Sequence, residues 1–468
     1  MGPLSNRKRL FHSNGVLIDD SGSVHFVESI VKDADAFFLS ISSRSLVLLL
    51  CQNSFESVSI YINCIERGIV PILIEADSDS SLVETLVNIY QPTYIFAPGN
   101  KTVGLNSYVA ESGFASYTVF KSKRQKPVPL YPELSLLLST SGTTGSPKLV
   151  RLSYNNLVAN ASSIVEYLKL NSSERAISNL PMNYSFGLSI INSHLHVGAS
   201  VLMTKESITQ RRFWDLFKRF NITSLSGVPY TFEIFKKFRL LNTELPSLKT
   251  ITQAGGKLSN DLITHFADFS AKRGVDFFVM YGQTEGTARL SYLSPNFVLE
   301  KLGSIGRPIP GGDFHLIDEQ GMKIVQPGNR GELVYSGANV MLGYAECKED
   351  LSLGDVNQGI LETGDIAQFD EDGFFYIVGR AKRFIKLFGN RVNLDELERL
   401  FSGINIQSAC CGKDNFLLIY ILNANEKEAA KEFLTKKLDI HFSVFDIRII
   451  DSFPRNTSGK ILYSKLAD

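Results

Sequence analysis

The sequence has few cysteines, no net charge and no long apolar run. Its 5 cysteines include no Cys-x-x-Cys pair, and their odd number fits a reducing cytoplasm better than a disulfide framework. Lys plus Arg and Asp plus Glu number 48 each, and a formal charge of zero argues against nucleic acid as a partner. The longest apolar run near the start, residues 46–51, is too short to span a bilayer, and the N-terminus has no signal-peptide pattern. We therefore expect a cytoplasmic protein with no integral membrane segment.

What the sequence does contain is a regular alternation of short apolar runs and helical patterns. The expected strands and helices alternate at residues 45–50, 55–66, 70–74, 82–90 and 94–97. Such alternation is typical of a parallel α/β layer. Further strand–helix units extend from about residue 176 to 280. The glycines, prolines and short β runs of residues 303–380 indicate a smaller β-rich subdomain.

The end of the chain has the pattern of a separate α+β module. Its expected elements are helices at 394–400 and 426–438 and strands at 416–422 and 446–450. The fold class that we predict is therefore α/β. A large N-terminal domain of parallel-sheet α/β subdomains occupies residues 1–380, including the β-rich part, and a small α+β C-terminal domain occupies residues 381–468.

Between two apolar runs, the stretch from Leu138 to Val150 is rich in small hydroxyl side chains and holds two glycines and one lysine. Gly142 and Gly145 let the backbone approach a ligand, and the hydroxyl and amide donors together with Lys148 suit a polyphosphate. The alternative is a polar surface turn. A Walker A loop is excluded, because two residues rather than four separate the glycines and a proline precedes the lysine.

The run Ser-Gly-Thr-Thr-Gly-Ser-Pro-Lys at 141–148 resembles the phosphate loop of the adenylate-forming superfamily. That superfamily of AMP-dependent synthetases and ligases includes acyl-CoA synthetases, peptide-synthetase adenylation domains and firefly luciferase. Its other motifs follow in order over roughly residues 135–460. The resemblance implies that ATP phosphates lie against Ser139, Thr140, Ser141, Gly142, Thr143, Thr144, Gly145 and Lys148.

A second motif, Tyr-Gly-Gln-Thr-Glu at 281–285, resembles the family's Tyr-Gly-x-Thr-Glu. It implies that Tyr281 stacks on adenine, that Thr284 contacts a phosphate, and that Glu285 holds Mg²⁺. An aromatic face suits a base, and a carboxylate suits a hard cation that bridges phosphates. The alternative is a strand end followed by an ordinary turn.

Two further motifs complete the implied nucleotide site. Gly255 and Gly256 belong to a segment that resembles the family's adenine-lining loop. Thr-Gly-Asp at 363–365 resembles the ribose-binding motif, so Asp365 is implied to accept both ribose hydroxyls, and Arg380 is implied to contact the ribose. The alternative for the basic residues is a solvated β-hairpin.

Near its end the chain has Pro-Arg-Asn-Thr-Ser-Gly-Lys at 454–460, which resembles the family's C-terminal motif with Asn456 as a departure. Lys460 is then the implied catalytic lysine, which neutralises charge as the carboxylate attacks the α-phosphate. The alternative is an exposed tail lysine. The resemblance also implies that the small C-terminal domain is mobile, with Lys382 at the hinge and Lys386 and Gly389 on the segment that serves the thiol half-reaction.

The acid pocket gives a weaker signal. Residues 181–187 resemble the segment that opens this pocket, which implies that Tyr184 is an aromatic gate and that Ser185 lines the pocket, together with Gly227. Amino-acid-activating domains have Asp where this chain has Ser185, and no Asp is nearby. We therefore expect a small or medium aliphatic, hydroxy or aryl carboxylic acid rather than an α-amino acid.

These motifs together predict an enzyme, an AMP-forming acid–thiol ligase. It would convert a carboxylic acid and ATP to an acyl-adenylate and pyrophosphate, with Mg²⁺, and transfer the acyl group to the thiol of CoA or of carrier-protein phosphopantetheine. One alternative is an acyl-AMP ligase that loads an acyl carrier protein without free CoA. Others are a non-catalytic nucleotide-binding homologue, luciferase-like oxidation, and a phosphoryl-transfer enzyme, which the loop spacing disfavours. The sequence leaves the acid and the acceptor open.

Overall fold

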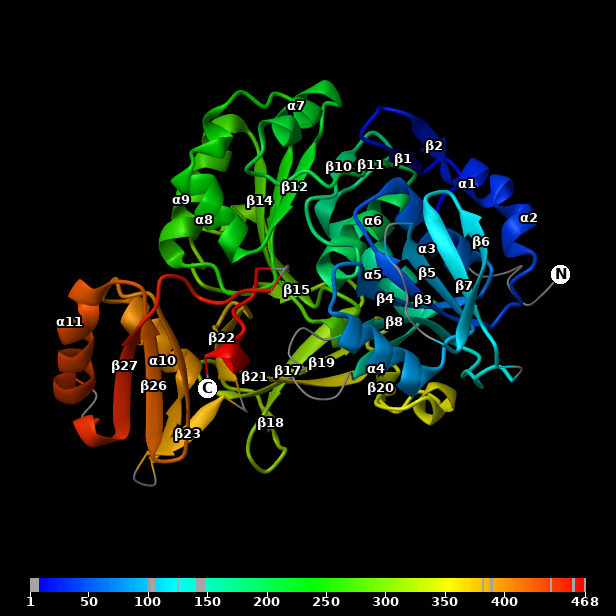
Figure 1. Cartoon of the computed structure of the whole chain (residues 1–468). Helices are drawn as coiled ribbons and strands as arrows, with labels where there is room; N and C mark the ends of the chain where they lie inside the picture. The colour runs from blue at the N-terminus through cyan, green and yellow to red at the C-terminus, as the bar shows by residue number, and fades with distance from the viewer. Residues whose placement is uncertain are drawn as a thin grey trace. The chain divides into compact units, whose positions relative to one another are not determined.

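The structure is a computed structural model of the chain, and it describes residues 8–99, 101, 106–124, 126–139, 148–380, 383–387, 390–437, 440–456 and 459–466 (Figure 1). The chain divides into two compact units. The larger unit comprises Met1–Asp313 and Ser336–Leu361, and the smaller unit comprises Phe314–Tyr335 and Glu362–Asp468. The sequence predicts a domain boundary between residues 380 and 381. The two compact units divide the chain in another way, so this boundary stays a prediction.

In the described part of the chain, the larger unit contains an eight-stranded sheet with parallel strands at its centre. Its strands, in the order β20-β9-β8-β4-β3-β5-β7-β6, are Gly343–Ala345, Leu149–Ser153, Leu134–Ser139, Val70–Glu75, Leu46–Cys51, Tyr94–Pro98, Tyr117–Ser122 and Tyr108–Phe114. β8, β4, β3 and β5 pair in parallel, and every residue of β3 is buried. Parallel strands with both faces covered are built from continuous apolar runs, and the predicted strands at 45–50, 70–74 and 94–97 are confirmed.

The second sheet of the larger unit has nine strands. In the order β16-β15-β14-β13-β12-β10-β11-β1-β2 they are Arg307–Pro308, Ser291–Leu293, Asp276–Tyr281, Thr250–Gln253, Ser224–Gly227, Arg175–Ile177, Ser200–Leu202, Val16–Ile18 and Val24–Phe26. The strands from β14 to β1 pair in parallel. Figure 1 shows the helices that connect β12, β13 and β14 lying beside these strands.

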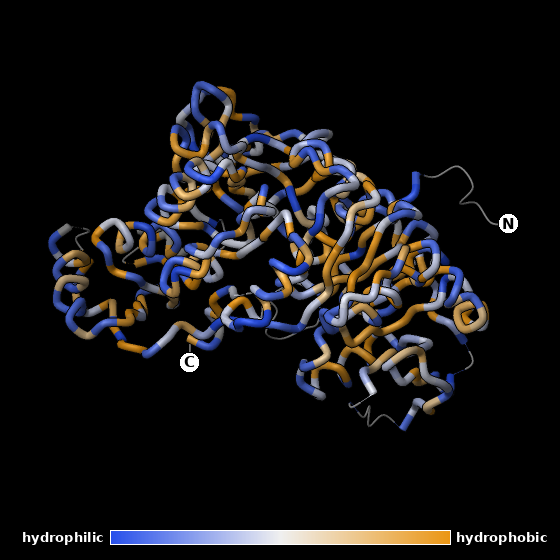
Figure 2. Tube along the Cα trace, turned by 90° about the horizontal axis from the view of Figure 1, so that it is seen from above, coloured by the Kyte–Doolittle hydropathy of each residue, from blue (hydrophilic) through white to orange (hydrophobic). Residues whose placement is uncertain are grey.

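Helices link the parallel strands and cover the sheets. Those of the larger unit are α1 (Val27–Asp33), α2 (Asp35–Phe38), α3 (Phe55–Glu66), α4 (Ser80–Tyr90), α5 (Tyr154–Leu168), α6 (Ser185–His196), α7 (Arg211–Arg219), α8 (Pro229–Lys237) and α9 (Asn260–Arg273). The helices expected at 55–66 and 82–90 are confirmed. α5 begins where Ser153 Oγ accepts the Asn156 N–H at 3.1 Å and Asn156 Oδ1 accepts the Ser153 N–H at 2.8 Å, a reciprocal cap. Figure 2 shows apolar segments running through the interior of this unit.

The edges of both sheets differ from the parallel layer that the sequence predicts. β9 pairs antiparallel with β8, and β7 pairs antiparallel with β5. The loop between β8 and β9 is too short for a crossover, which takes a dozen or more residues, so β9 must return antiparallel. The strand–helix alternation predicts the sheet centres, and the short β8–β9 connection decides the direction of β9.

The smaller unit contains mostly β-structure. Its sheet of five strands, in the order β18-β17-β19-β21-β22, comprises Lys323–Ile324, Gly312–Ile317, Gly331–Gly337, Ile360–Phe369 and Phe375–Arg380. A hairpin and a three-stranded sheet follow, with β23 (Phe384–Leu387), β24 (Asn390–Asn393), β25 (Ser408–Lys413), β26 (Phe416–Ile421), β27 (Phe445–Ile449) and helix α10 (Leu394–Ser402). The predicted β-rich stretch and the α+β pattern of the chain's end are both present in these elements.

The helix predicted at 426–438 is shorter than expected. α11 spans Lys427–Glu432, and a π-helical turn, Phe433–Lys437, continues it. The hydroxyl of Thr435 donates to the carbonyls of Lys431 and Glu432, which competes with the α-helical ladder. Among the described helices of both units, none is long and apolar enough to cross a membrane.

Candidate functional site

Several predicted site residues of the larger unit lie at one edge of the nine-stranded sheet. β12, β13 and β14 are parallel neighbours, and their register pairs Gly227 with Gln253 and Gln253 with Val279. The carboxyl ends of these strands therefore meet, which brings together Gly227, the Gly255–Gly256 loop after β13, and Tyr281 at the end of β14. This edge is where open α/β sheets bind ligands.

The loop after β13 is tightly built. Gln253 Nε2 donates to the carbonyls of Ala254, at 3.3 Å, and Gly256, at 2.8 Å, which fixes the bend. Gly255 has φ +82°, and a Cβ there would lie 2.4 Å from the Tyr184 hydroxyl. A side chain is thus excluded at Gly255 both by backbone conformation and by contact. The predicted gate Tyr184 and the predicted adenine loop lie against each other.

The acid-pocket segment also contacts the motif at 281–285. Tyr184 precedes α6, and Ser185 is the first residue of that helix. Ser185 Oγ lies 3.2 Å from Thr284 Oγ1, at hydrogen-bonding distance. Burial raises the pKa of Tyr184, so its hydroxyl stays protonated. The structure thus joins the residues predicted to hold the acid to a residue predicted to contact phosphate.

Tyr344, which belongs to none of the sequence motifs, links the predicted metal ligand Glu285 to the predicted loop lysine Lys148. Its hydroxyl donates to Glu285 Oε1 at 2.7 Å, and Lys148 Nζ lies 3.6 Å from the centroid of its ring. Burial and the Glu285 charge both raise the pKa of Tyr344, so the hydroxyl remains a donor. Lys148 Nζ also lies 3.4 Å from Glu346 Oε1. Tyr344 reaches this place because β20 pairs with β9, opposite Val150.

We predict that Tyr344→Phe weakens the use of Mg²⁺–ATP. The change keeps the ring beneath Lys148 and removes the hydrogen bond to Glu285, so acid-dependent ATP–pyrophosphate exchange should fall about tenfold, with a higher Mg²⁺ requirement. A Mg²⁺ titration of the exchange rate measures this. Tyr90→Phe is the matched control, because the Tyr90 hydroxyl donates to Ala345 O at 2.7 Å on the same strand. If both variants lower only the melting temperature, Tyr344 has no positioning role.

Asn339 stabilises the turn after Glu285 through hydrogen bonds. Thr287 has φ +66°, which is unusual for a β-branched residue, and its hydroxyl donates to Asn339 O at 2.5 Å. Asn339 Nδ2 donates to Gly286 O at 2.8 Å and to Arg289 O at 3.1 Å. These bonds hold the backbone that carries Thr284 and Glu285.

In the smaller unit, the predicted ribose residues are paired. Asp365 lies opposite Arg380 across β21 and β22, and Arg380 Nε donates to Asp365 Oδ1 at 3.2 Å. The Asp365 side chain is 10% exposed and the Arg380 side chain 63% exposed, so the arginine extends into solvent from a buried carboxylate. Thr363 Oγ1 accepts the Asp365 N–H at 3.1 Å and donates to Leu333 O at 2.7 Å, which fixes the turn.

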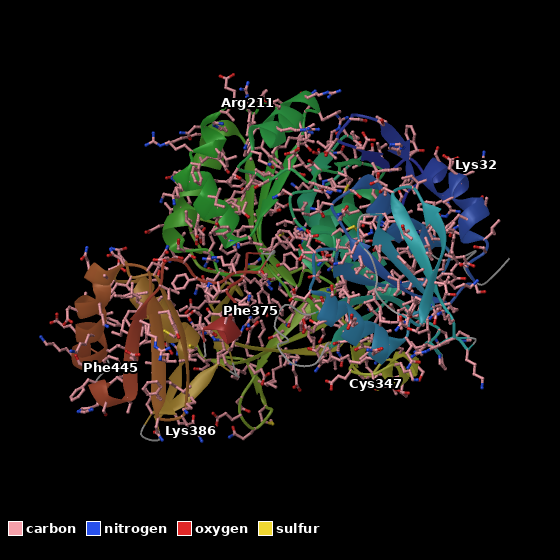
Figure 3. The ribbon with its side chains drawn as sticks, viewed as in Figure 1. Lys32, Arg211, Cys347, Phe375, Lys386 and Phe445 are labelled. Carbon is pink, nitrogen blue, oxygen red and sulfur yellow. The ribbon has the colours of Figure 1, made fainter. Side chains whose placement is uncertain are left out.

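Lys460 closes a short turn of the smaller unit. Its N–H donates to Asn456 Oδ1, and its carbonyl accepts the Asn456 N–H, both at 2.9 Å. The departure from the family motif at Asn456 therefore has a structural role. Lys386 is exposed on the β23–β24 hairpin, where Asp414 Oδ1 accepts its N–H at 2.9 Å (Figure 3). Ser139 is the last residue of β8. The other predicted site residues lie outside the described residues: Thr140, Ser141, Gly142, Thr143, Thr144, Gly145, Lys382 and Gly389.

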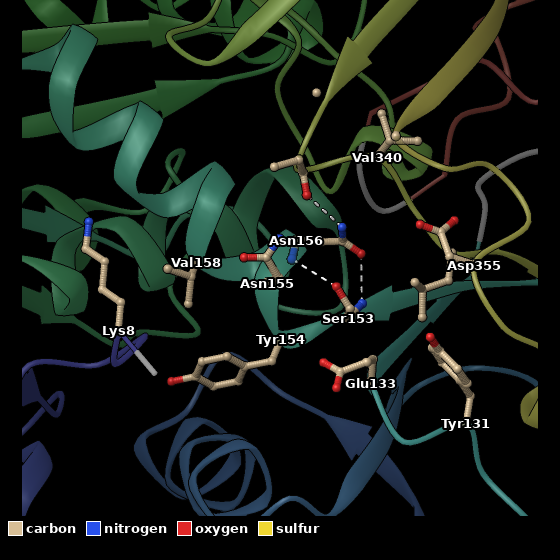
Figure 4. Close-up of a pocket in the computed structure, with 14 residues that line it drawn as sticks. Lys8, Tyr131, Glu133, Ser153, Tyr154, Asn155, Asn156, Val158, Val340 and Asp355 are labelled. Atoms are coloured by element: carbon tan, nitrogen blue, oxygen red, sulfur yellow. Dashed lines mark hydrogen bonds between the residues drawn. The ribbon is translucent and has the colours of Figure 1, made fainter. Parts of the chain in front are cut away.

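A cavity of about 620 Å³ lies elsewhere in the larger unit, at the start of α5 (Figure 4). Its walls include Lys8, Glu133, Asn155 and Asp355. None of the predicted site residues lines it. The carboxyl edge of the nine-stranded sheet, rather than this cavity, is where several predicted residues of the larger unit converge.

The donors at this edge fit Mg²⁺ bound together with a phosphate substrate. Within the part of the chain that the structure describes, no group of three or more His, Cys, Asp or Glu side chains is arranged to hold a metal. Mg²⁺ commonly takes one or two carboxylates, with substrate phosphates and waters completing its shell. Glu285 supplies one carboxylate beside the Thr284 hydroxyl, so this donor set suits Mg²⁺–ATP and not an all-protein metal cage.

The profile of the AMP-binding enzyme family matches residues 36–345, which is more than half of the chain. The chain therefore belongs to the AMP-binding enzyme family. The 4-coumarate–CoA ligase-like 6 protein of Arabidopsis thaliana is 28% identical over 360 residues, which cover 73% of this chain and 63% of that protein. Feruloyl-CoA synthase of an Amycolatopsis species is 29% identical over 279 residues, covering 59% and 56%. The chain thus spans less than two thirds of the length of these relatives.

Solved structures share the fold. The o-succinylbenzoate coenzyme A synthetase of Bacillus subtilis in complex with AMP has a TM-score of 0.78 at 21% identity, covering 99% of this chain and 98% of that one. ATP-bound MatB from Rhodopseudomonas palustris has a TM-score of 0.75 at 19% identity, covering 97% and 95%. These similarities confirm the predicted α/β fold class of adenylate-forming enzymes.

Proposed function

We propose that the protein activates a carboxylic acid with ATP to give an acyl-adenylate and pyrophosphate, and then transfers the acyl group to a thiol. The observation that carries this proposal is the contact between two predicted sites. Ser185 of the acid segment lies 3.2 Å from Thr284 of the phosphate motif. The names of the relatives, which are CoA ligases and CoA synthases, support CoA as the acceptor.

The residues of this chain would assist the first step through charge. A carboxylate oxygen attacks the α-phosphorus of ATP, the bond to the β-phosphate oxygen breaks, and pyrophosphate leaves. Two anions must meet, so the site must supply positive charge at the attacked phosphate and at the leaving group. We assign to Lys148 the stabilisation of charge on the leaving pyrophosphate. We assign to Lys460 the stabilisation of charge at the α-phosphate that is attacked. Mg²⁺ bound through Glu285 would add charge at the phosphates.

The ribose would be held by the pair in the smaller unit. Asp365 presents a carboxylate that can accept two hydroxyl hydrogen bonds, and Arg380 already holds its orientation. Tyr281, at the end of β14, would stack on the adenine, with Gly255 and Gly256 beside the ring.

The test is ATP–pyrophosphate exchange with a panel of carboxylic acids. The proposal predicts that one class of acid stimulates exchange and that α-amino acids do not, because Ser185 replaces the aspartate that pairs with an amino group. Exchange without dependence on any acid, or acid-dependent formation of ADP, would contradict it.

The thiol half-reaction has its own prediction. A bulky substitution, Gly389→Trp, should leave exchange near the wild-type rate and block thioester formation, because Gly389 is assigned to the passage for the thiol. Thioester is measured with CoA and with a phosphopantetheinylated carrier protein, and transfer to the carrier alone would identify an acyl-AMP ligase of the alternative kind. Loss of both exchange and thioester formation in Gly389→Trp would contradict the assignment of Gly389.

A further inference from the structure

Arg289 is a buried cation without an acidic partner in the described part of the chain. The residue is 2% exposed. Its Nε donates to Ser189 Oγ at 3.2 Å, and its Nη1 lies 3.0 Å from Tyr167 Oη and 2.9 Å from Met280 Sδ. Its guanidinium carbon lies 4.8 Å from the centroid of the Phe186 ring. All of these groups are neutral, and an arginine cannot give up its proton.

The same unit shows what a structural buried arginine looks like. Arg151 is 0% exposed, and its guanidinium donates to four backbone carbonyls, those of Leu342, Tyr344, Leu353 and Gly354. Carbonyl oxygens are strong acceptors, whereas a thioether and hydroxyls that also need partners are weaker ones. Arg289 therefore keeps donor capacity that Arg151 has used.

The charges around Arg289 do not compensate it. His194 follows on the same helix as Ser189, and burial lowers its pKa to about 4, with Arg289 adding to the effect, so the ring is neutral. Glu174, the carboxylate that faces His194, is paired with Lys249 at 2.9 Å. A buried charge without a counter-ion is unfavourable unless a ligand supplies one.

Arg289 contacts α6 one helical turn after the residue that contacts Thr284. Ser185 and Ser189 are four residues apart on α6 and so share a face of the helix. Ser185 Oγ faces Thr284 at 3.2 Å, and Ser189 Oγ faces Arg289. Both serines line a narrow cavity between α5 and α6, whose wall also contains Asn160 and Asn192. One face of α6 therefore contacts both Thr284 of the phosphate motif and the uncompensated cation Arg289.

We propose that Arg289 binds a second carboxylate of the acid, so that the substrate is a dicarboxylic acid whose other carboxylate is activated beside Thr284. Binding of a carboxylate by Arg289 does not depend on the proposed function. Activation of the other carboxylate beside Thr284 rests on the proposed adenylation. A guanidinium binds a carboxylate through two parallel hydrogen bonds, which also sets the orientation of the acid. The substrate would then be selected by its length between the two carboxylates.

The first experiment measures thermal unfolding without ligand. Arg289→Met removes an uncompensated charge, so the variant should melt at or above the wild-type temperature. Arg151→Met is the matched control, and it should melt several degrees lower, because it leaves backbone carbonyls buried without donors. If Arg289→Met is destabilised like Arg151→Met, or fails to fold, Arg289 is a structural cation and the proposal is wrong.

The second experiment measures binding of dicarboxylic acids and of monocarboxylic acids of the same length. The probes are succinate with butanoate, glutarate with pentanoate, adipate with hexanoate, and isophthalate with 3-methylbenzoate. Calorimetry should show that the wild type binds at least one diacid about tenfold or more tightly than its partner, and that Arg289→Met loses or reverses this preference. A wild type that prefers the monoacid in every pair, or a preference that survives in Arg289→Met, would overturn the proposal.

ATP–pyrophosphate exchange with the same acids separates this inference from the proposed function. Arg289-dependent diacid binding without exchange would refute adenylation and leave the carboxylate site standing. Exchange that monoacids drive equally in the wild type and in Arg289→Met would support adenylation and refute the role of Arg289. Exchange that diacids drive in the wild type and monoacids drive in the variant would support both.

Discussion

Lys460→Ala should lose acid-dependent ATP–pyrophosphate exchange by about 100- to 1000-fold, the range found when one charge-stabilising donor is removed from an active site. The lysine would face a reaction in which negative charge collects between the acid oxygen and the α-phosphate. Its backbone N–H and carbonyl bond to Asn456, and the substitution leaves both of these bonds in place. The loss should therefore occur without a change in melting temperature.

Two controls make this prediction specific. Lys465→Ala removes an exposed lysine from the same end of the chain and should keep wild-type exchange. Acyl-adenylate supplied to Lys460→Ala should still react with the thiol, because the lysine is assigned to the first half-reaction. An Ala variant that exchanges at the wild-type rate would place the catalytic lysine elsewhere.

Glu285→Gln should lower exchange about 100-fold and raise the Mg²⁺ concentration needed for half-maximal rate. The glutamine keeps a carbonyl oxygen that can accept the Tyr344 hydroxyl, so the substitution removes a charge and preserves the shape of the site. A hard cation binds a carboxylate more strongly than an amide. The rate should recover in part at high Mg²⁺.

The matched control for this charge is Glu300→Gln. The Glu300 side chain is 63% exposed on the same unit, so its removal changes the net charge equally without touching the site. An unchanged Mg²⁺ dependence in Glu285→Gln would contradict the role assigned to that carboxylate.

Local signals were sufficient for the elements at the sheet centres. The apolar run of β3 predicts a strand covered on both faces, because this signal depends only on residues that are close together in the sequence. The resemblance of the motifs supplied the candidate site residues, whose roles stay predictions. The contact between Ser185 and Thr284 is the structural support for two of them.

Tyr344 and Arg289 could not be identified from local sequence. Tyr344 matters because β20 pairs with β9, which brings a distant strand beside the loop lysine. Arg289 follows the motif at 281–285, yet its interest lies in its burial and in the neutral groups around it, which only the packing of α6 reveals. Both features depend on contacts between residues that are far apart in the sequence. Periodicity and motifs do not predict such contacts.

The most direct test of the central claim follows oxygen from the acid. A carboxylic acid that drives exchange is labelled with oxygen-18 in its carboxylate and incubated with the protein, ATP, Mg²⁺ and CoA, and the nucleotide products are analysed by mass spectrometry. Attack of the carboxylate on the α-phosphorus predicts AMP that carries one labelled oxygen, because the thiol later displaces AMP at the acyl carbon. Unlabelled AMP, or ADP with the label in inorganic phosphate, would contradict an acyl-adenylate.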